Sequence, residues 1–140
     1  MNLDDSVGFL LNKAAGEMRY ALETALRPHD LTPAQWSVLA RLDVENGQMI
    51  SDVGRSLYFD RPTMSGIVRR LESKGLLEKR RDSQDQRVFR IYITASGSEL
   101  MKELPLLAKA VNQRALDGFS QEEIVTLQSL VRRVLGNMTR

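Results

Sequence analysis

A change of hydrophobic period within residues 48–97 constrains the fold of this chain more than any other feature. Apolar residues first recur at the three- and four-residue spacing of helices, in two short segments joined by residues 58–60. After Gly75 they follow a strand pattern, in Leu76–Lys79 and Val88–Ile93, on either side of a polar tip. Two helices, a turn and a hairpin predict a winged helix-turn-helix, a mainly α fold with a small β-wing (α+β).

The second helical segment, at about 61–74, has an apolar face and a polar face. Its inward positions follow the i, i+3, i+4, i+7 pattern and are Met64, Ile67, Val68 and Leu71. Its outward positions are basic or hydroxylic apart from one glycine and are Arg61, Thr63, Ser65, Gly66, Arg69, Arg70 and Lys74. Pro62 suits the first helical position, and Gly75 suits the left-handed residue that ends a helix. Ser51 is the expected N-cap of the first segment, at about 52–58.

Charge is polarised along the chain, although the whole chain carries only +2. Residues 61–90 contain nine basic and four acidic residues, so this segment carries +5 and the remainder carries −3. A focused positive field attracts phosphate, which indicates a nucleic-acid partner. On charge alone, a solvated basic face without a partner stays open as the alternative.

The segment before residue 48 predicts two amphipathic helices. Residues 5–27 carry one long apolar stripe, and Pro28 ends it because proline lacks the amide hydrogen and clashes with the preceding turn. Thr32 and Gln35 then form a capping box for the next helix. Within that helix, we expect Trp36 to be a core or interface anchor rather than a ligand contact.

The chain after Thr94 also returns to helix. An apolar stripe runs through residues 100–115, and Pro105 predicts a kink near 101–105 rather than a straight rod. Ser120 and Glu123 form a second capping box before the last apolar stripe. Two copies of the chain would bury these terminal stripes more completely than one, which favours a homodimer.

Composition excludes several kinds of site. A chain of 140 residues fits one domain, and without cysteine it holds no disulfide, thiolate nucleophile or thiol switch. Because His29 is its single histidine, we expect no zinc site. We see no phosphate loop and no pairing of a nucleophile with a base, so we expect no enzyme and no cofactor. An acidic N-terminus and no apolar run near ~20 residues predict a cytoplasmic protein outside the membrane.

Three segments carry a resemblance to a known family, namely LTPAQWSVLARL, DRPTMSGIVRRLESKGLLEKR and RRDSQDQRVFRIYITASG. In this order and spacing they resemble the MarR family of bacterial winged-helix transcription regulators, over essentially the whole chain. The ranges that the resemblance implies are a single domain at 1–140, a winged helix-turn-helix at 31–97, a recognition helix at about 61–74, a wing at about 77–93, and dimerisation helices at 1–28 and 98–140.

The function that this resemblance implies is regulation of transcription by a homodimer. Its recognition helices would enter the major groove of double-stranded DNA at a palindromic operator, and its wings would enter the minor groove. The resemblance further implies a repressor that releases DNA when a small, often phenolic or aromatic, anion binds between the dimerisation and DNA-binding parts. Tyr20, His29, Trp36 and Arg41 lie near the expected ligand region, and a structural role is the alternative for each.

The expected DNA contacts come from the recognition helix and the wing tip. They are Arg61, Pro62, Thr63, Ser65, Arg69, Arg70, Lys74, Asp85, Gln86 and Arg87. Asp85 and Arg87 match the D-x-R pattern of the family's wing, in which the carboxylate orients a guanidinium that suits a narrow minor groove. The alternative is that Asp85 and Arg87 form an exposed ion pair that only closes the hairpin.

Gly66 departs from the family pattern. Many relatives have Ser-Thr-Val-Thr-Arg where residues 62–66 of this chain are Pro-Thr-Met-Ser-Gly. Glycine cannot reach a base edge, whereas arginine at a guanine edge contributes ~1–3 kcal/mol of discrimination. We therefore expect a shallower sequence preference than relatives with that arginine have. A winged-helix protein that binds DNA with little specificity is the alternative function.

Overall fold

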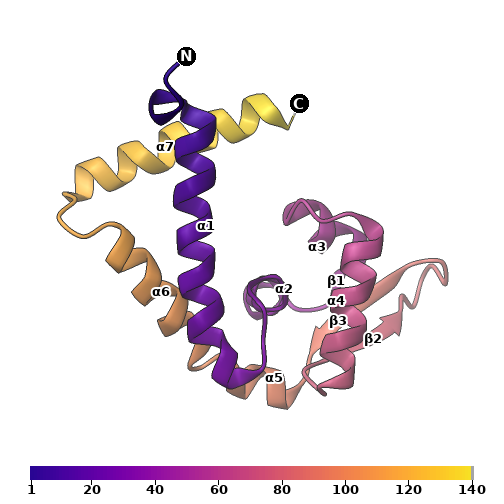
Figure 1. Cartoon of the computed structure of the whole chain (residues 1–140). Coiled ribbons are helices and arrows are strands. Elements are labelled where there is room, and N and C mark those ends of the chain that lie inside the picture. The colour runs from indigo at the N-terminus through magenta and orange to yellow at the C-terminus, as the bar shows by residue number, and fades with distance from the viewer. Residues whose placement is uncertain (140) are drawn as a thin grey trace.

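The computed structural model describes residues 1–139 as a mainly helical chain with one small antiparallel sheet, which confirms the predicted fold class. Its elements are η1 (Leu3–Asp5), α1 (Val7–Leu26), η2 (Arg27–His29), α2 (Pro33–Val44), β1 (Gln48–Met49), α3 (Ile50–Ser56), α4 (Arg61–Ser73), β2 (Leu77–Arg81), β3 (Phe89–Ile93), α5 (Ala95–Leu100), α6 (Leu104–Ala115) and α7 (Gln121–Met138). Figure 1 shows α1, α6 and α7 on one side of the molecule and α3, α4 and the hairpin on the other.

The two predicted capping boxes are present, and both fix the start of a helix. The backbone N–H of Gln35 donates to Thr32 Oγ1 at 3.2 Å, and the side-chain Oε1 of Gln35 accepts from the backbone N–H of Thr32 at 3.3 Å. Ser120 and Glu123 make the same reciprocal pair at 3.1 and 2.9 Å. Each pair satisfies backbone donors that a helix start leaves without partners, so α2 and α7 begin where the sequence predicts.

Two predicted helix starts are wrong by one or two residues. Ser51 does not cap α3, because Gln48 and Met49 pair with β3 and the helix begins directly after them, at Ile50, without a side-chain cap. Pro62 lies at the second rather than the first position of α4, because Asp60 is the N-cap and accepts from the Thr63 N–H at 2.8 Å.

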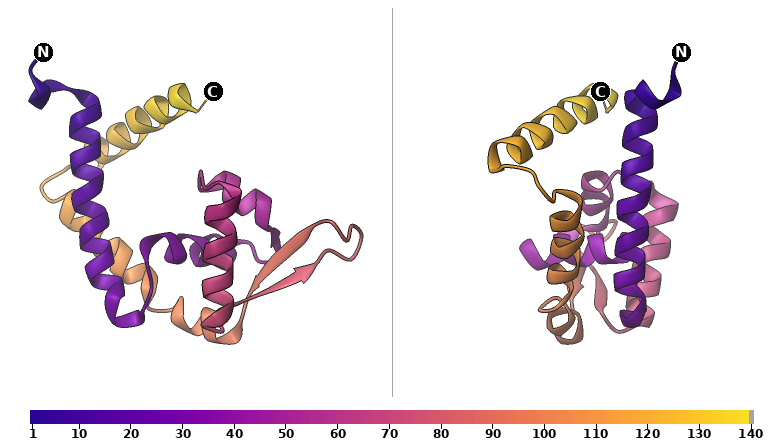
Figure 2. Two further views of the ribbon diagram at one scale, coloured as in Figure 1. Left: turned by 45° about the vertical axis from the view of Figure 1, so that its right-hand side comes forward. Right: turned by 60° about the vertical axis from the view of Figure 1, so that its left-hand side comes forward.

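The wing is an antiparallel hairpin with a short third strand. β2 and β3 pair from Leu77 opposite Ile93 to Arg81 opposite Phe89, as the sequence predicts. β1 adds to the other edge of β3, so the strand order is β1-β3-β2. The prediction lacks β1, because two residues are too few to show a period. In Figure 2 the hairpin projects away from the helices.

The hydrophobic core lies in the half of the molecule that holds the winged helix-turn-helix. Its fully buried side chains are Leu26, Val38, Leu39, Leu42, Val53, Leu71, Ile91 and Leu104, and the predicted inward face of α4 joins them. Trp36 packs partly buried against this cluster. By contrast, α1 buries only Leu26, and α7 buries no residue at all.

The helix is interrupted, rather than kinked as predicted, near residues 101–105. α5 ends at Leu100 and α6 begins at Leu104, with Pro105 in its first turn and a short turn between the two helices. Pro105 has no amide hydrogen to donate to an earlier carbonyl, and its ring would clash with the preceding turn, so it disfavours one continuous helix through this point. Met101 and Leu104 remain buried on either side of the break.

Candidate nucleic-acid interface

The polar face of α4 presents three arginine side chains whose guanidinium groups make no hydrogen bond, ion pair or ring contact with residues 1–139. Arg61, Arg69 and Arg70 are exposed, and within residues 1–139 their guanidinium groups have no hydrogen-bond acceptor, carboxylate or aromatic partner. Pro62, Thr63 and Ser65 are exposed on the same helix. These donors are therefore available to an external acceptor, such as a phosphate oxygen or a base edge.

The start of α4 is held by Asp60, which the sequence analysis placed only in a turn. Its carboxylate accepts from the Thr63 backbone N–H, and this hydrogen bond holds the pKa of Asp60 below its ordinary value. An aspartate two residues before a proline in the first turn of a helix is a recognisable capping signal. Asp60 fixes the first turn of α4 and so aims Arg61.

Gly66 is buried rather than outward-facing as predicted. A Cβ atom built on Gly66 would lie 3.1 Å from Arg70 Nη1. Apart from Ser65, Ile67 and the backbone of α4, no other group of residues 1–139 lies within 4 Å of that point. The side chain of a helical residue leans toward the preceding turn, so Arg70 lies over the position four residues earlier. The glycine makes room for Arg70 on the outer face of α4.

Lys74 is also placed differently from the prediction, which had it on the outward face of α4. Its ammonium donates to the backbone carbonyl of Asp30 and to Gln35 Oε1, the latter at 3.1 Å. The Lys74 side chain is only 26% exposed. Because its donors already have partners at the junction of η2 and α2, the geometry does not support Lys74 as a DNA contact.

The wing tip holds Asp85 and Arg87 in a two-pronged ion pair. Arg87 Nε donates to Asp85 Oδ1 and Arg87 Nη2 donates to Asp85 Oδ2, both at 3.1 Å. The Arg87 side chain is 90% exposed, so the pair orients the guanidinium without burying it. This side-chain bond and the backbone N–H of Arg87 lower the pKa of Asp85. Gln86 is exposed between them.

Asp82 organises the tip and was missed by the sequence analysis. One of its oxygens accepts from the backbone N–H groups of Gln84 and Asp85, each at 2.9 Å, and the other accepts from Arg90 Nε at 2.6 Å. The Arg90 bond, followed by the Gln84 bond, lowers the pKa of Asp82. An aspartate that opens a turn is a local signal that could have found it.

The remaining basic residues of the wing lie against aromatic rings. Lys79 and Arg81 lie over the Phe89 ring, with their charged groups 4.7 and 4.8 Å from its centre. Arg80 lies 4.6 Å from the centre of the Tyr92 ring. These cation–π contacts hold long side chains against the hairpin while their charges stay exposed.

The structure brings together two of the four residues expected near a ligand. Trp36 and Arg41 line a pocket of about 500 Å³ with residues from α2, β1 and the end of α3, whereas Tyr20 and His29 do not line it. This pocket lies between α2 and the end of α3. Arg41 Nη2 donates to the Ser56 carbonyl at 3.3 Å.

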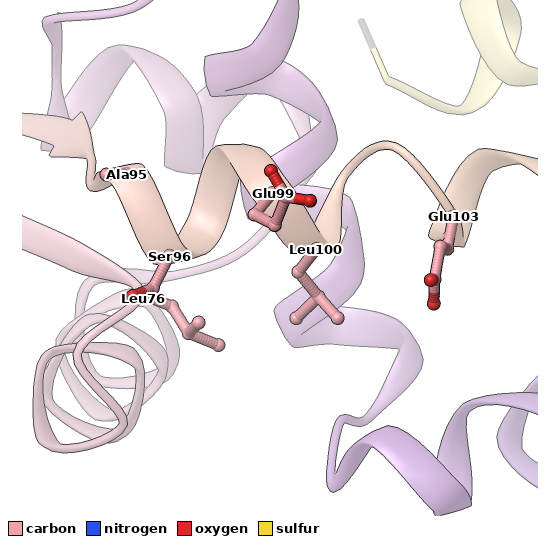
Figure 3. Close-up of a pocket in the computed structure, with 6 residues that line it drawn as sticks. All are labelled: Leu76, Ala95, Ser96, Glu99, Leu100 and Glu103. Carbon is pink, nitrogen blue, oxygen red and sulfur yellow. The ribbon is translucent and has the colours of Figure 1, made fainter.

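A second pocket, of about 540 Å³, lies along α5 (Figure 3). Its lining includes the carboxylates of Glu99 and Glu103 and no basic side chain, so it does not suit an anion. Across residues 1–139, no three histidine or acidic side chains cluster in a way that could hold a metal ion. None of the described helices is long and apolar enough to cross a membrane.

Comparisons with known proteins find relatives of this chain in sequence and in fold. The model of the MarR family matches residues 31–89. The HTH-type transcriptional regulator SarZ of Staphylococcus haemolyticus is 28% identical over 96% of this chain and 90% of its own length. The S. aureus MepR in a complex with DNA has a TM-score of 0.88 at 25% identity, covering 94% of this chain and 98% of that chain. BpsR of Bordetella bronchiseptica, whose DNA binding is regulated by 6-hydroxynicotinic acid, has a TM-score of 0.89 at 26% identity over 96% of both chains.

Proposed function

This chain belongs to the MarR family of DNA-binding transcriptional regulators, and we propose that it is a homodimeric repressor that recognises a palindromic operator in double-stranded DNA. The observation that carries the proposal is the set of unpartnered guanidinium groups on α4 beside an ordered basic wing. In this proposal residues 31–97 bind DNA, and residues 1–28 and 98–140 form the dimer. The family and its relatives are regulators, so the chain is not an enzyme.

In the proposed complex α4 lies in the major groove. Arg61, at the start of the helix, contacts a phosphate, as do donors at the start of many DNA-binding helices. Arg69 and Arg70 reach base edges, where a bidentate arginine distinguishes guanine. The exposed groups that complete the helix contact are Pro62, Thr63 and Ser65.

The wing of the proposed complex enters the minor groove with Arg87 at its tip. Asp85 holds the Arg87 guanidinium in one orientation, and a planar, permanently charged group suits a narrow groove with a negative potential. Gln86 lies exposed between them and adds a polar contact. Lys74 is left out of the proposed contact set, because its ammonium is held at the junction of η2 and α2.

The proposed homodimer is supported by apolar surface that the single chain leaves uncovered. The exposed large apolar side chains of α1 and α7 include Val7, Leu10, Leu11, Val125, Leu127, Leu130, Val131, Val134, Leu135 and Met138. Large apolar side chains that stay exposed in such number on two helices favour a protein interface. A two-fold axis would pair the same helices of both copies and would place two α4 helices for a palindromic site.

Release of DNA by a small molecule is the regulatory part of the proposal. Its support is the related BpsR, whose DNA binding is regulated by 6-hydroxynicotinic acid. The effector would favour a separation of the two α4 helices other than the ~34–36 Å that half-sites one helical turn apart require. Structures of both states test this mechanism, and an effector that weakened binding without changing the separation would contradict it.

The first experiment is selection from a pool of random DNA duplexes at increasing salt. A two-fold symmetric motif with half-sites about 10 base pairs apart supports a dimeric, sequence-specific regulator. Retention without an enriched motif supports the second candidate, a winged-helix protein with little specificity, which Gly66 favours because it offers no side chain to a base. No retention would contradict both candidates for the ligand-free protein.

A further inference from the structure

We propose that Lys74 is a positioning residue, which fastens the C-terminal end of α4 to the junction between α1 and α2. This contact fixes the position and orientation of α4 relative to the terminal helices. The proposal rests on the proposed function, because the setting of α4 matters only if two copies present their α4 helices to one operator. It replaces the DNA contact that the sequence predicts for Lys74.

The geometry of Lys74 shows a side chain that leaves its own helix. Lys74 follows the last residue of α4, and its backbone N–H still donates to the Arg70 carbonyl. Its ammonium reaches residues that are 39 and 44 positions earlier in the sequence. A lysine ammonium has three donors, and here they face the Asp30 carbonyl, Gln35 Oε1 and, at 3.7 Å, the Asp30 carboxylate.

The acceptors of Lys74 belong to the segment where the chain turns from α1 into α2. Asp30 has a left-handed backbone, with φ of 55°, at the end of η2. Gln35 is 4% exposed, and its Oε1 also accepts from the Thr32 N–H in the capping box of α2. Lys74 therefore bonds to the two features that set the direction of the turn: the strained residue and the helix cap.

This connection links the two halves of the proposed function. α1 belongs to the side of the molecule with the uncovered apolar stripes, whereas α4 carries the unpartnered arginines. Within the chain, a change of the turn between α1 and α2 would move α4 relative to α1 unless a contact opposes it. An ammonium that makes two hydrogen bonds, on a side chain that is 26% exposed, opposes such a change more strongly than a fully exposed ion pair does.

The direct test measures the distance between α1 and α4. The chain has no cysteine, so cysteines introduced by Thr24→Cys and Ser73→Cys, both at exposed positions, would carry the only two spin labels. Labelled chains are mixed with excess unlabelled protein, so that only distances within one copy are measured. We expect a narrow distance distribution, and we expect Lys74→Met to broaden it. An unchanged distribution in Lys74→Met would overturn the proposal.

Matched variants separate this role from a general loss of charge or of fold. Lys102→Met removes an exposed lysine that pairs with Glu99 at 2.8 Å, and it should leave the distribution narrow. Lys74→Arg keeps a donor-rich cation and should restore most of the order. Asp30→Asn keeps the backbone carbonyl and tolerates the left-handed backbone, so it should have little effect. Broadening in Lys102→Met as well would overturn the proposal.

A second readout uses operators whose half-sites are set at different separations. The unmodified protein should prefer one separation, and Lys74→Met should flatten that preference while binding to random DNA keeps its salt dependence. If Lys74 contacts a phosphate instead, the variant loses affinity equally at all separations and its salt slope falls by about 1, which overturns the proposal. If the unmodified protein prefers no half-site separation, the proposed function is contradicted. The positioning role of Lys74 is then tested by the spin-label distances alone.

Discussion

The proposed recognition helix, α4, and the wing are both basic, but their basic side chains differ in whether they have partners within the protein. Within residues 1–139, no partner lies against the guanidinium groups of Arg61, Arg69 and Arg70 on α4. Every basic residue of the wing has one, either a carboxylate, a carbonyl or an aromatic ring. Side chains that are already placed lose less conformational freedom on binding. The helix is therefore suited to adaptable readout, and the wing to recognition of a fixed groove shape.

The largest expected effect comes from removing an unpartnered arginine. We expect Arg69→Ala or Arg70→Ala to weaken binding to the selected operator by about 1–3 kcal/mol, because a bidentate base contact is lost. Fluorescence anisotropy with the operator and with a scrambled duplex measures both affinities. An equal loss on the two duplexes would show that the arginine contacts only phosphate.

Arg61→Ala should weaken all sequences about uniformly. A phosphate contact carries no sequence information, so the variant should bind operator and random DNA more weakly by the same factor. The slope of affinity against salt should fall by about 1 in the same titrations. A selective loss on the operator would assign Arg61 to a base edge instead.

Gly66→Ala should change the stability of the protein and its affinity for the operator in opposite directions. Alanine favours a helix interior over glycine by about 0.5–1 kcal/mol, and the nearest neighbour of its Cβ is the movable end of Arg70 at 3.1 Å. We expect a higher melting temperature but weaker operator binding, because Arg70 must shift. Unchanged operator binding in Gly66→Ala would show that the position of Arg70 is unimportant.

Asp85→Asn should lower operator affinity a few-fold, although it removes a negative charge next to DNA. The reason is that Arg87 loses its two-pronged carboxylate partner and must be ordered on binding. Glu78→Gln removes the same charge from an exposed pair with Arg80 and is the matched control, with affinity unchanged or slightly higher. Higher affinity in both variants would mean that the wing pair only closes the hairpin.

The smallest expected effect is the response of the wing to pH. Hydrogen bonds lower the pKa of Asp82 and Asp85 in the folded chain. Their contribution to stability is therefore complete above the ordinary carboxyl pKa and is lost as the pH falls through the lowered pKa. The amide resonances of Gln84 and Arg87 should therefore titrate with midpoints below the ordinary aspartate pKa of about 3.9. Midpoints at or above that ordinary value would contradict the lowered pKa of Asp82 and Asp85.

The parts of this fold that follow a local pattern could be read from the sequence. The spacing of Met64, Ile67, Val68 and Leu71 identifies the buried face of α4, and all four are buried. Thr32 and Ser120 identify helix starts because a capping box needs only four consecutive residues. The D-x-R pattern likewise predicts the pairing of Asp85 with Arg87, because the two side chains are only two residues apart in a tight turn.

The features that depend on distant residues could not be read in this way. Lys74 looks outward on a helical wheel, and only the folded chain brings Asp30 and Gln35 to its ammonium. Gly66 also looks exposed, because a wheel does not show that the side chain of Arg70 lies over it. The hydrophobic period predicts which face of a helix is buried. The contacts of long side chains depend on the tertiary structure, which the period does not show.

The uncovered apolar face of α7 has a consequence for how operator occupancy depends on the concentration of the protein. In the proposed dimer, the species that binds an operator forms from two chains, so at low abundance its concentration rises with the square of the chain concentration. A twofold change in synthesis then changes operator occupancy by up to about fourfold. If the proposed dimer forms through α7, a helix that buries none of its residues within its own chain would make operator occupancy respond steeply to the expression level.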